Sequence, residues 1–96
     1  MASFVILPKT IVSGQKAVTA AGTAEALGTS TQLISGVTIK ALADNTDYIY
    51  VGDSDVSSSA GIELSPGESV FVECNNLATI YVDSAVNGEG VGYIGG

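Results

Sequence analysis

The chain has 96 residues, ten acidic side chains, three basic ones and no histidine, which gives a net charge of −7. This length allows one domain at most. The basic residues are Lys9, Lys16 and Lys40, too few to neutralise a phosphate backbone, so nucleic-acid binding is excluded. Without histidine, and with Cys74 as the single cysteine, histidine-based catalysis and zinc sites of cysteine and histidine are excluded as well.

Charged residues make up only 14% of the chain, although 46% of it is hydrophobic. A soluble domain usually carries about 25% charged residues. The shortage predicts that part of the surface is covered by other subunits, so a homo-oligomer is expected. Valine, isoleucine and threonine are abundant, and their branched side chains favour strands.

Residues 1–12 are predicted to form an extended N-terminal arm or an edge strand. Pro8 has no backbone N–H, which excludes a central strand at this place. The apolar run is too short to span a membrane, and no membrane association is expected. The arm is interpreted as an attaching element that adds a strand to a neighbour's sheet edge, and its apolar residues are Phe4, Val5, Ile6, Leu7, Ile11 and Val12.

Residues 13–35 are rich in alanine, glycine, threonine and serine, and short strands and loops are expected there. From residue 36 onward the pattern is clearer, because apolar and polar residues alternate and turn residues separate the alternating segments. The segment 65–68, Ser-Pro-Gly-Glu, predicts a tight turn with glycine at positive φ. Strands are predicted over 36–42, 47–52, 62–64, 69–74, 77–83 and 91–94, with turns or loops at 43–46, 53–61, 65–68, 75–76 and 87–88.

Short strands with a turn signal every 8–12 residues or so are typical of sandwiches and small barrels. The sequence therefore predicts an all-β fold: a single small antiparallel β-sandwich of jelly-roll or Greek-key type over 13–96, with the extended arm over 1–12. The segments 49–56 and 80–86 resemble each other. They indicate either a duplicated strand-turn-strand unit or simply two ordinary strands.

The candidates for chemistry each have a structural alternative. Cys74 shares a strand face with Val70 and Val72 and is interpreted as a core residue rather than a nucleophile. Asp53-Ser54-Asp55 begins like an EF-hand loop, but Ser58 stands where that loop requires glycine. A calcium site of another kind in the acidic loops at 44–55 stays open, and neither a metal nor a cofactor is predicted.

Glu63, Glu68 and Glu73 offer pairs of carboxylates such as glycosidases use. A chain this small leaves little room for a substrate cleft, and no catalytic residue and no enzyme activity are predicted. Four tyrosines are interpreted instead as contacts with a capsid or with another subunit, because tyrosine is enriched at interfaces. They are Tyr48, Tyr50, Tyr81 and Tyr93, and a position at the rim of the core is the alternative for each.

Residues 36–94 resemble small structural proteins of tailed-bacteriophage virions. The resemblance rests on five segments and on Asn45-Thr46: GVTIKAL at 36–42, IYVGDS at 49–54, GIELSPGESV at 61–70, LATIYV at 77–82 and VNGEGVGY at 86–93. It implies a β-sandwich located in the virion, used as a capsid decoration (cement) protein or as a tail or collar component. The leading expectation is a decoration protein that stabilises the head by binding its outer surface.

The partners implied by this resemblance are the major capsid protein or other virion proteins, with further copies of the chain forming a homo-oligomer such as a trimer. Two alternatives remain at this point. One is a structural component of the tail, the collar or the fibre base. The other is a small β-sandwich adhesin that binds host surface glycans. No catalytic residues belong to the resemblance.

Overall fold

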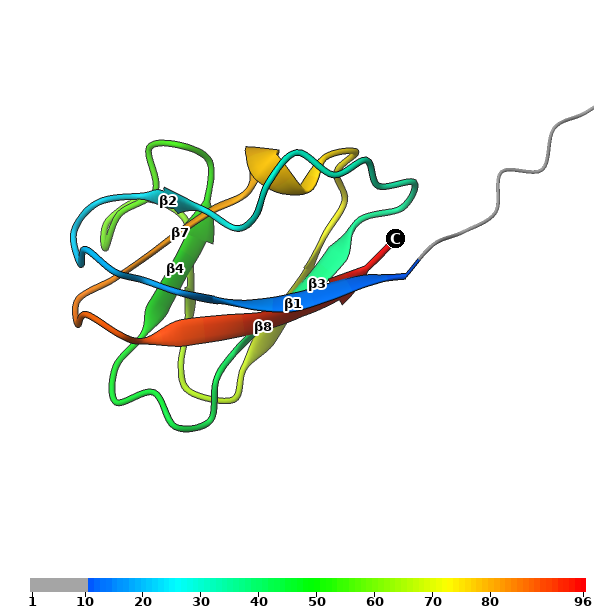
Figure 1. Ribbon diagram of the computed structural model, residues 1–96. Helices are drawn as coiled ribbons and strands as arrows, with labels where there is room; N and C mark the ends of the chain where they lie inside the picture. The colour runs from blue at the N-terminus through cyan, green and yellow to red at the C-terminus, as the bar shows by residue number, and fades with distance from the viewer. Residues whose placement is uncertain (1–10) are drawn as a thin grey trace, which may run out of the picture.

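The computed structural model describes residues 11–96 as two packed, four-stranded antiparallel sheets (Figure 1). In spatial order, sheet A consists of β1 (Val12–Ala17), β8 (Gly90–Gly95), β3 (Val37–Ala41) and β6 (Ser69–Val72). Sheet B consists of β2 (Glu25–Ala26), β7 (Tyr81–Ser84), β4 (Ile49–Gly52) and β5 (Ile62–Leu64). A short 3-10 helix, η1 (Leu77–Thr79), precedes β7. Within residues 11–96, no helix has the length and apolarity needed to cross a membrane.

The strand pairing follows one rule. β1 pairs with β8, β2 with β7, β3 with β6 and β4 with β5, as in one long antiparallel ribbon. Further pairing of β3 with β8 and of β4 with β7 rolls the ribbon into two sheets. Eight strands wrapped in this way form a jelly roll. The predicted all-β sandwich of jelly-roll type is therefore confirmed.

Inward-facing aliphatic side chains from both sheets form the core, and strand alternation determines which residues they are. In β3, Val37, Ile39 and Ala41 are fully buried, whereas Lys40 between them is exposed. Each fully buried valine, leucine or isoleucine contributes about 1.5–3 kcal/mol. The other core members are Val18, Leu27, Leu33, Ile49, Val51, Leu64, Leu77, Ile80, Val82 and Val91.

The predicted turn at 65–68 is present, with φ of +88° at Gly67 and a 2.9 Å hydrogen bond from the Glu68 amide to the Ser65 carbonyl. The prediction of one strand over 77–83 was wrong in its first half, where η1 stands. The Asn76 side chain accepts a 2.9 Å hydrogen bond from the Ala78 amide, which caps this short helix. The local bond outcompetes an extended backbone there.

The two similar segments lie next to each other. β4 and β7 are antiparallel neighbours in sheet B, with Tyr50 opposite Asp83. They do not head equivalent hairpins, because β4 is followed by β5 in the same sheet whereas β7 is followed by β8 in the other sheet.

Candidate functional site

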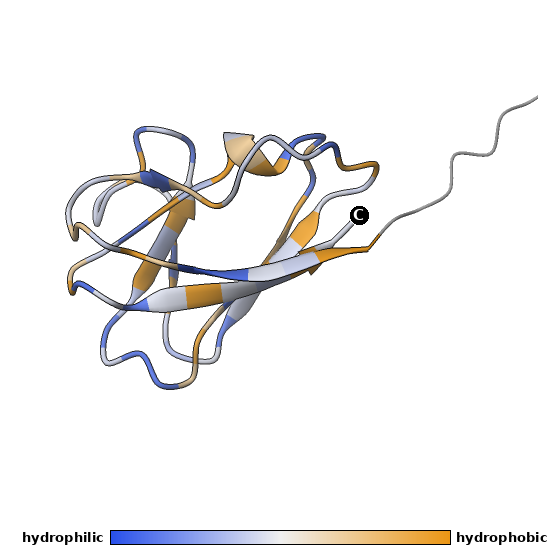
Figure 2. Cartoon of the chain, viewed as in Figure 1, coloured by the Kyte–Doolittle hydropathy of each residue, from blue (hydrophilic) through white to orange (hydrophobic). Residues whose placement is uncertain are grey.

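The outer face of sheet A exposes large apolar side chains. The strand register places Ser13, Ile94, Thr38 and Phe71 side by side in one row across the four strands. Ile94 is 55% exposed and Phe71 is 54% exposed. Ile11, which is 74% exposed, lies at the same end just before β1, and this apolar end of β1 is visible beside the C-terminus in Figure 2.

Two shallow hollows lie on this outer face. The next outward-facing row across the sheet contains Gln15, Gly92 and Lys40. Gly92 lies between the other two and has no side chain to fill the space. The resulting hollow has a volume of about 590 Å³. A second hollow of about 260 Å³ is lined by Ile11, Phe71 and Ile94 among others, and the two share Ile94. Side chains of a partner protein can fit into these two hollows.

The same face is unusually poor in charge for so acidic a chain. The described strands of sheet A contain two lysines, Lys16 and Lys40, and no aspartate or glutamate. All ten acidic residues of the chain therefore lie outside these strands. A partner can cover the outer face without stripping water from a strand carboxylate, which is a costly step. We call this surface, made by Ile11, Thr38, Phe71, Gly92 and Ile94, the apolar face.

The residues predicted for the N-terminal arm fall into two groups. Phe4, Val5, Ile6 and Leu7 lie outside the described residues. Ile11 belongs to the apolar face, whereas Val12 begins β1, the edge strand of sheet A, and packs half-buried against the core.

The four tyrosines do not form one surface. Tyr93 faces inward from β8 and packs against the core, close to Gly14 and Gly28. Tyr50 points away from the core of sheet B but is only 8% exposed. Burial raises the pKa of its hydroxyl, and nearby acidic residues such as Asp47 add to this effect. Tyr50 therefore offers little area to a partner, and Tyr93 is partly buried, as the alternative position at the rim of the core implies; the role of the tyrosines as contact residues stays a prediction.

The other two tyrosines are more open. Tyr48, just before β4, is 42% exposed, and Tyr81 on β7 is half-buried. Phe71 and Ile94 were not among the predicted contact residues. The alternation that turns Val70 and Val72 toward the core necessarily turns Phe71 outward, so the signal that identifies Phe71 was present in the sequence.

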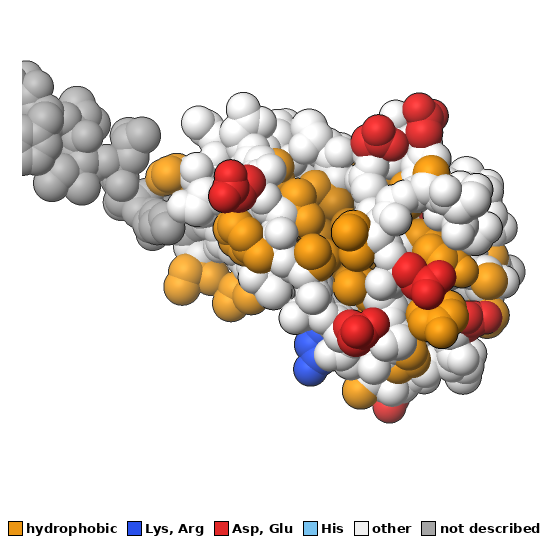
Figure 3. Space-filling model, turned by 180° about the vertical axis from the view of Figure 1, so that it is seen from behind, with side chains coloured by type: hydrophobic (Ala, Val, Ile, Leu, Met, Phe, Trp, Pro, Cys, Tyr) orange, Lys and Arg blue, Asp and Glu red, His pale blue; other side chains and the backbone are white. Residues whose placement is uncertain are grey.

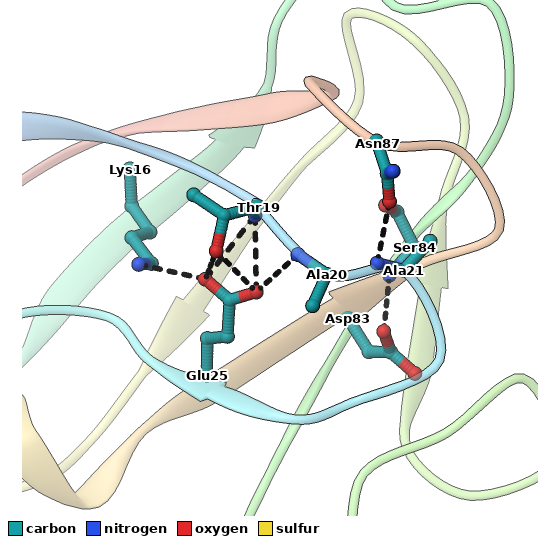
Figure 4. A network of polar contacts seen from close by, with 8 residues as sticks. All are labelled: Lys16, Thr19, Ala20, Ala21, Glu25, Asp83, Ser84 and Asn87. Carbon is teal, nitrogen blue, oxygen red and sulfur yellow. Dashed lines mark hydrogen bonds and ion pairs between the residues drawn. The ribbon is translucent and has the colours of Figure 1, made fainter.

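A carboxylate clamp joins β1 to β2 (Figure 4). The Glu25 carboxylate accepts hydrogen bonds from the amides of Thr19, at 3.0 Å, and Ala20, at 2.8 Å, and lies 2.9 Å from Lys16 Nζ. Burial acts to raise the pKa of Glu25, but these hydrogen bonds and the lysine charge outweigh it and lower the pKa to about 2. Beside it, Asn87 Oδ1 accepts a 2.8 Å bond from the Ala21 amide. The clamp stabilises the chain's passage between the sheets.

Two further bonded carboxylates, Glu89 and Glu68, are also structural. Glu89 is buried, and its Oε1 accepts bonds from the Thr46 hydroxyl and amide and from the Asp47 amide at 2.6–2.8 Å. These hydrogen bonds lower the pKa of Glu89 although burial acts to raise it, and the bond from the Thr46 hydroxyl has the largest effect. Glu68 bonds the hydroxyl and the amide of Ser65 within its own turn, which lowers its pKa.

The acidic loops do not converge. In the part of the chain that the structure describes, no three or more histidine, cysteine, aspartate or glutamate side chains are grouped so as to hold a metal ion. Asp53, for example, accepts a 2.9 Å hydrogen bond from the Asp55 amide and shapes its own loop. Cys74 has a free thiol and packs half-buried against the core, as interpreted from the sequence.

Comparison with known proteins gives no match: no family model, no curated protein and no solved structure is similar to this chain. The apolar face is therefore the feature from which a function has to be argued.

Proposed function

We propose that this chain is a structural protein of a bacteriophage particle, a decoration protein that binds the outer surface of the head through its apolar face. The observation that carries the proposal is the exposed pair Phe71 and Ile94 on a face whose strands hold no carboxylate. Aromatic and aliphatic anchors on a surface poor in charge are typical of the centre of a protein interface. The phage setting comes from the resemblance of residues 36–94.

The energetics of such a role are reasonable for a small domain. A standard interface covers about 800 Å² of each partner. At about 25 cal/mol per Å² its apolar part gives a gross gain on the order of 10 kcal/mol before association costs. Repetition of the contact over a shell adds avidity when neighbouring copies also touch each other. The jelly-roll fold is a common scaffold with many functions, so the surface and not the fold supports the assignment.

The proposal predicts that Phe71→Ser combined with Ile94→Ser weakens binding to empty heads of the phage whose genome encodes the chain. Loss of two central apolar anchors typically costs about 2 kcal/mol or more, so binding should fall by about thirtyfold or more. Co-sedimentation of the purified protein with the heads measures this directly.

The control is Val86→Ser, which removes a 40% exposed apolar side chain from the loop between β7 and β8, away from the apolar face. It should bind as the unaltered protein does. Far-ultraviolet circular dichroism checks that all variants are folded. Undiminished binding of the double variant, or absence of the wild-type chain from the head in an imaged particle, would refute the proposal.

A further inference from the structure

A cleft opens between the two sheets on the side where β5 and β6 form their edges. It has a volume of about 370 Å³ and its lining is mostly apolar. The same side of the molecule is drawn in Figure 3, where apolar side chains gather among carboxylates. The lining residues are Val51, Gly52, Asp53, Ile62, Val70, Val72, Glu73, Cys74, Thr79 and Ile80.

The cleft exposes side chains that point toward the interior. Ile62 shares its strand face with the buried Leu64, yet it is 53% exposed. On the facing edge, Val70 and Val72 turn inward from β6 but are only half-buried. An inward-facing isoleucine left open to water indicates that the sandwich is incomplete along this side. β5 and β6 are also edge strands, whose outer backbone groups can pair with an added strand.

We propose that the N-terminal segment 4–7 of a second copy of this chain occupies the cleft as an added strand. Phe-Val-Ile-Leu is apolar, rich in strand-forming residues and as long as the four-residue β6. In an extended chain it presents two apolar side chains to each face, so one pair can enter the cleft. Pro8 follows directly and ends any strand pairing, because it lacks an N–H.

Charge favours the same occupant. Asp53 and Glu73 line the cleft, and no lysine is among the residues that line it in the described chain. Residues 1–10 carry one charged side chain, Lys9, and no acidic one. Although the chain has a net charge of −7, this segment therefore approaches an acidic rim without repulsion.

Distance indicates that the segment comes from another copy. The described chain starts at Ile11 beside β1, and β1 and β6 are opposite edges of sheet A, three strand spacings or about 14 Å apart. The four residues from Ile11 back to Leu7 span at most about 14 Å when fully extended. All four would have to be fully extended for Leu7 of the same chain to reach β6, the strand whose Val70 and Val72 line the cleft. A second copy has no such limit, and its contact is head-to-tail, so repetition builds a ring or a chain of subunits.

The test uses the full chain and two variants. Val5→Asp with Ile6→Asp puts a carboxylate on each face of the segment, and Ile62→Asp puts one in the cleft. Sedimentation velocity over a range of concentrations should show the wild-type chain associating and each variant remaining monomeric. An equal mixture of the two variants should form dimers that grow no further, since the segment variant keeps its cleft and the cleft variant keeps its segment.

Cys74, the single cysteine of the chain, lines the cleft and supplies a second readout. Its rate of reaction with a thiol reagent should fall as the wild-type protein is concentrated. Because segments and clefts are used up together, about nine-tenths of the clefts are filled at a protein concentration of about ninety times the dissociation constant, where the rate should have fallen about tenfold. Both variants should react at a rate that does not depend on concentration.

Val86→Asp is the matched control, because it adds the same charge at an exposed apolar residue outside the cleft and should associate like the wild-type chain. A monomeric wild-type chain, association that survives in either variant, or a mixture that does not pair would each overturn the proposal. Protection of Cys74 that is independent of concentration would also overturn it, by assigning the cleft to a segment of the same chain. The inference does not rest on the phage assignment, since head binding is tested separately through Phe71 and Ile94.

Discussion

Gly36→Ala is expected to destabilise the domain by more than about 3 kcal/mol, as the sum of backbone strain and a collision between strands. Gly36 has φ of +140°, a conformation that side chains with a Cβ rarely adopt. A Cβ at this position would lie 2.2 Å from the Val72 carbonyl oxygen and 3.0 Å from the Glu73 Cα. Both are backbone atoms that cannot swing aside, so β3 and β6 would have to separate. Urea unfolding followed by circular dichroism measures the loss.

The control for this prediction is Gly67→Ala in the turn before β6. Gly67 also has a positive φ, +88°, but a Cβ there meets no atom within 4 Å. It should therefore cost only the backbone strain, about 1–2 kcal/mol. Equal destabilisation by the two substitutions would contradict the collision at Gly36.

Stability is expected to fall steeply in acid because three bonded carboxylates have lowered pKa values in the folded state. For Glu25 the folded pKa is about 2 against an ordinary value of 4.5, and the pKa values of Glu68 and Glu89 are lowered too. A lowered folded pKa stabilises the fold fully above the unfolded pKa, and this contribution is lost as the pH falls through the folded pKa. The free energy of unfolding should thus be steady above about pH 5 and decline from about pH 4.5 toward pH 2.

Thermal melting at a series of pH values checks this, with about 0.15 M salt present to screen repulsion among the exposed acidic groups. Glu25→Gln should lower stability at neutral pH by about 1–2 kcal/mol, because charge-assisted hydrogen bonds are lost. It should also flatten the decline in acid. Glu63→Gln is the control, since Glu63 is exposed on β5 and makes no side-chain hydrogen bond within residues 11–96. A melting temperature that does not change from pH 5 to pH 2 would contradict the role given to the bonded carboxylates.

The phage proposal and the self-assembly proposal use different surfaces. The apolar face covers sheet A, whereas the cleft lies between the edges β5 and β6. A subunit can therefore bind a head through one surface and a neighbouring copy through the other. If both proposals hold, the two contacts would cover Ile11, Ile62, Phe71 and Ile94, which are exposed in the single chain, and would account for its low content of charged residues, 14%.

Much of the local structure could be predicted from the sequence alone. Alternation from residue 36 onward identified strands such as β3 and β4 and the shared face of Val70 and Val72, because side chains of an extended chain alternate with a period of two. The turn at 65–68 was predictable because proline and glycine restrict the backbone locally. The low content of charged residues and the absence of histidine can be read from the composition alone.

Only the tertiary structure decided which strands pair and which outward side chains stay exposed. All strands offer the same backbone donors and acceptors, so a local pattern does not name a partner for β1 or for β7. For the same reason the sequence left two positions open for Tyr50 and Tyr93, an interface or the rim of the core, and the packing makes Tyr50 buried and Tyr93 partly buried. It also could not bring Phe71 and Ile94, far apart in the chain, into one row. The sequence by itself determined which residues of a strand share a face and how few charges the chain carries. The wrapping of the ribbon into two sheets decided which strands lie side by side, and so where the apolar face and the open cleft form.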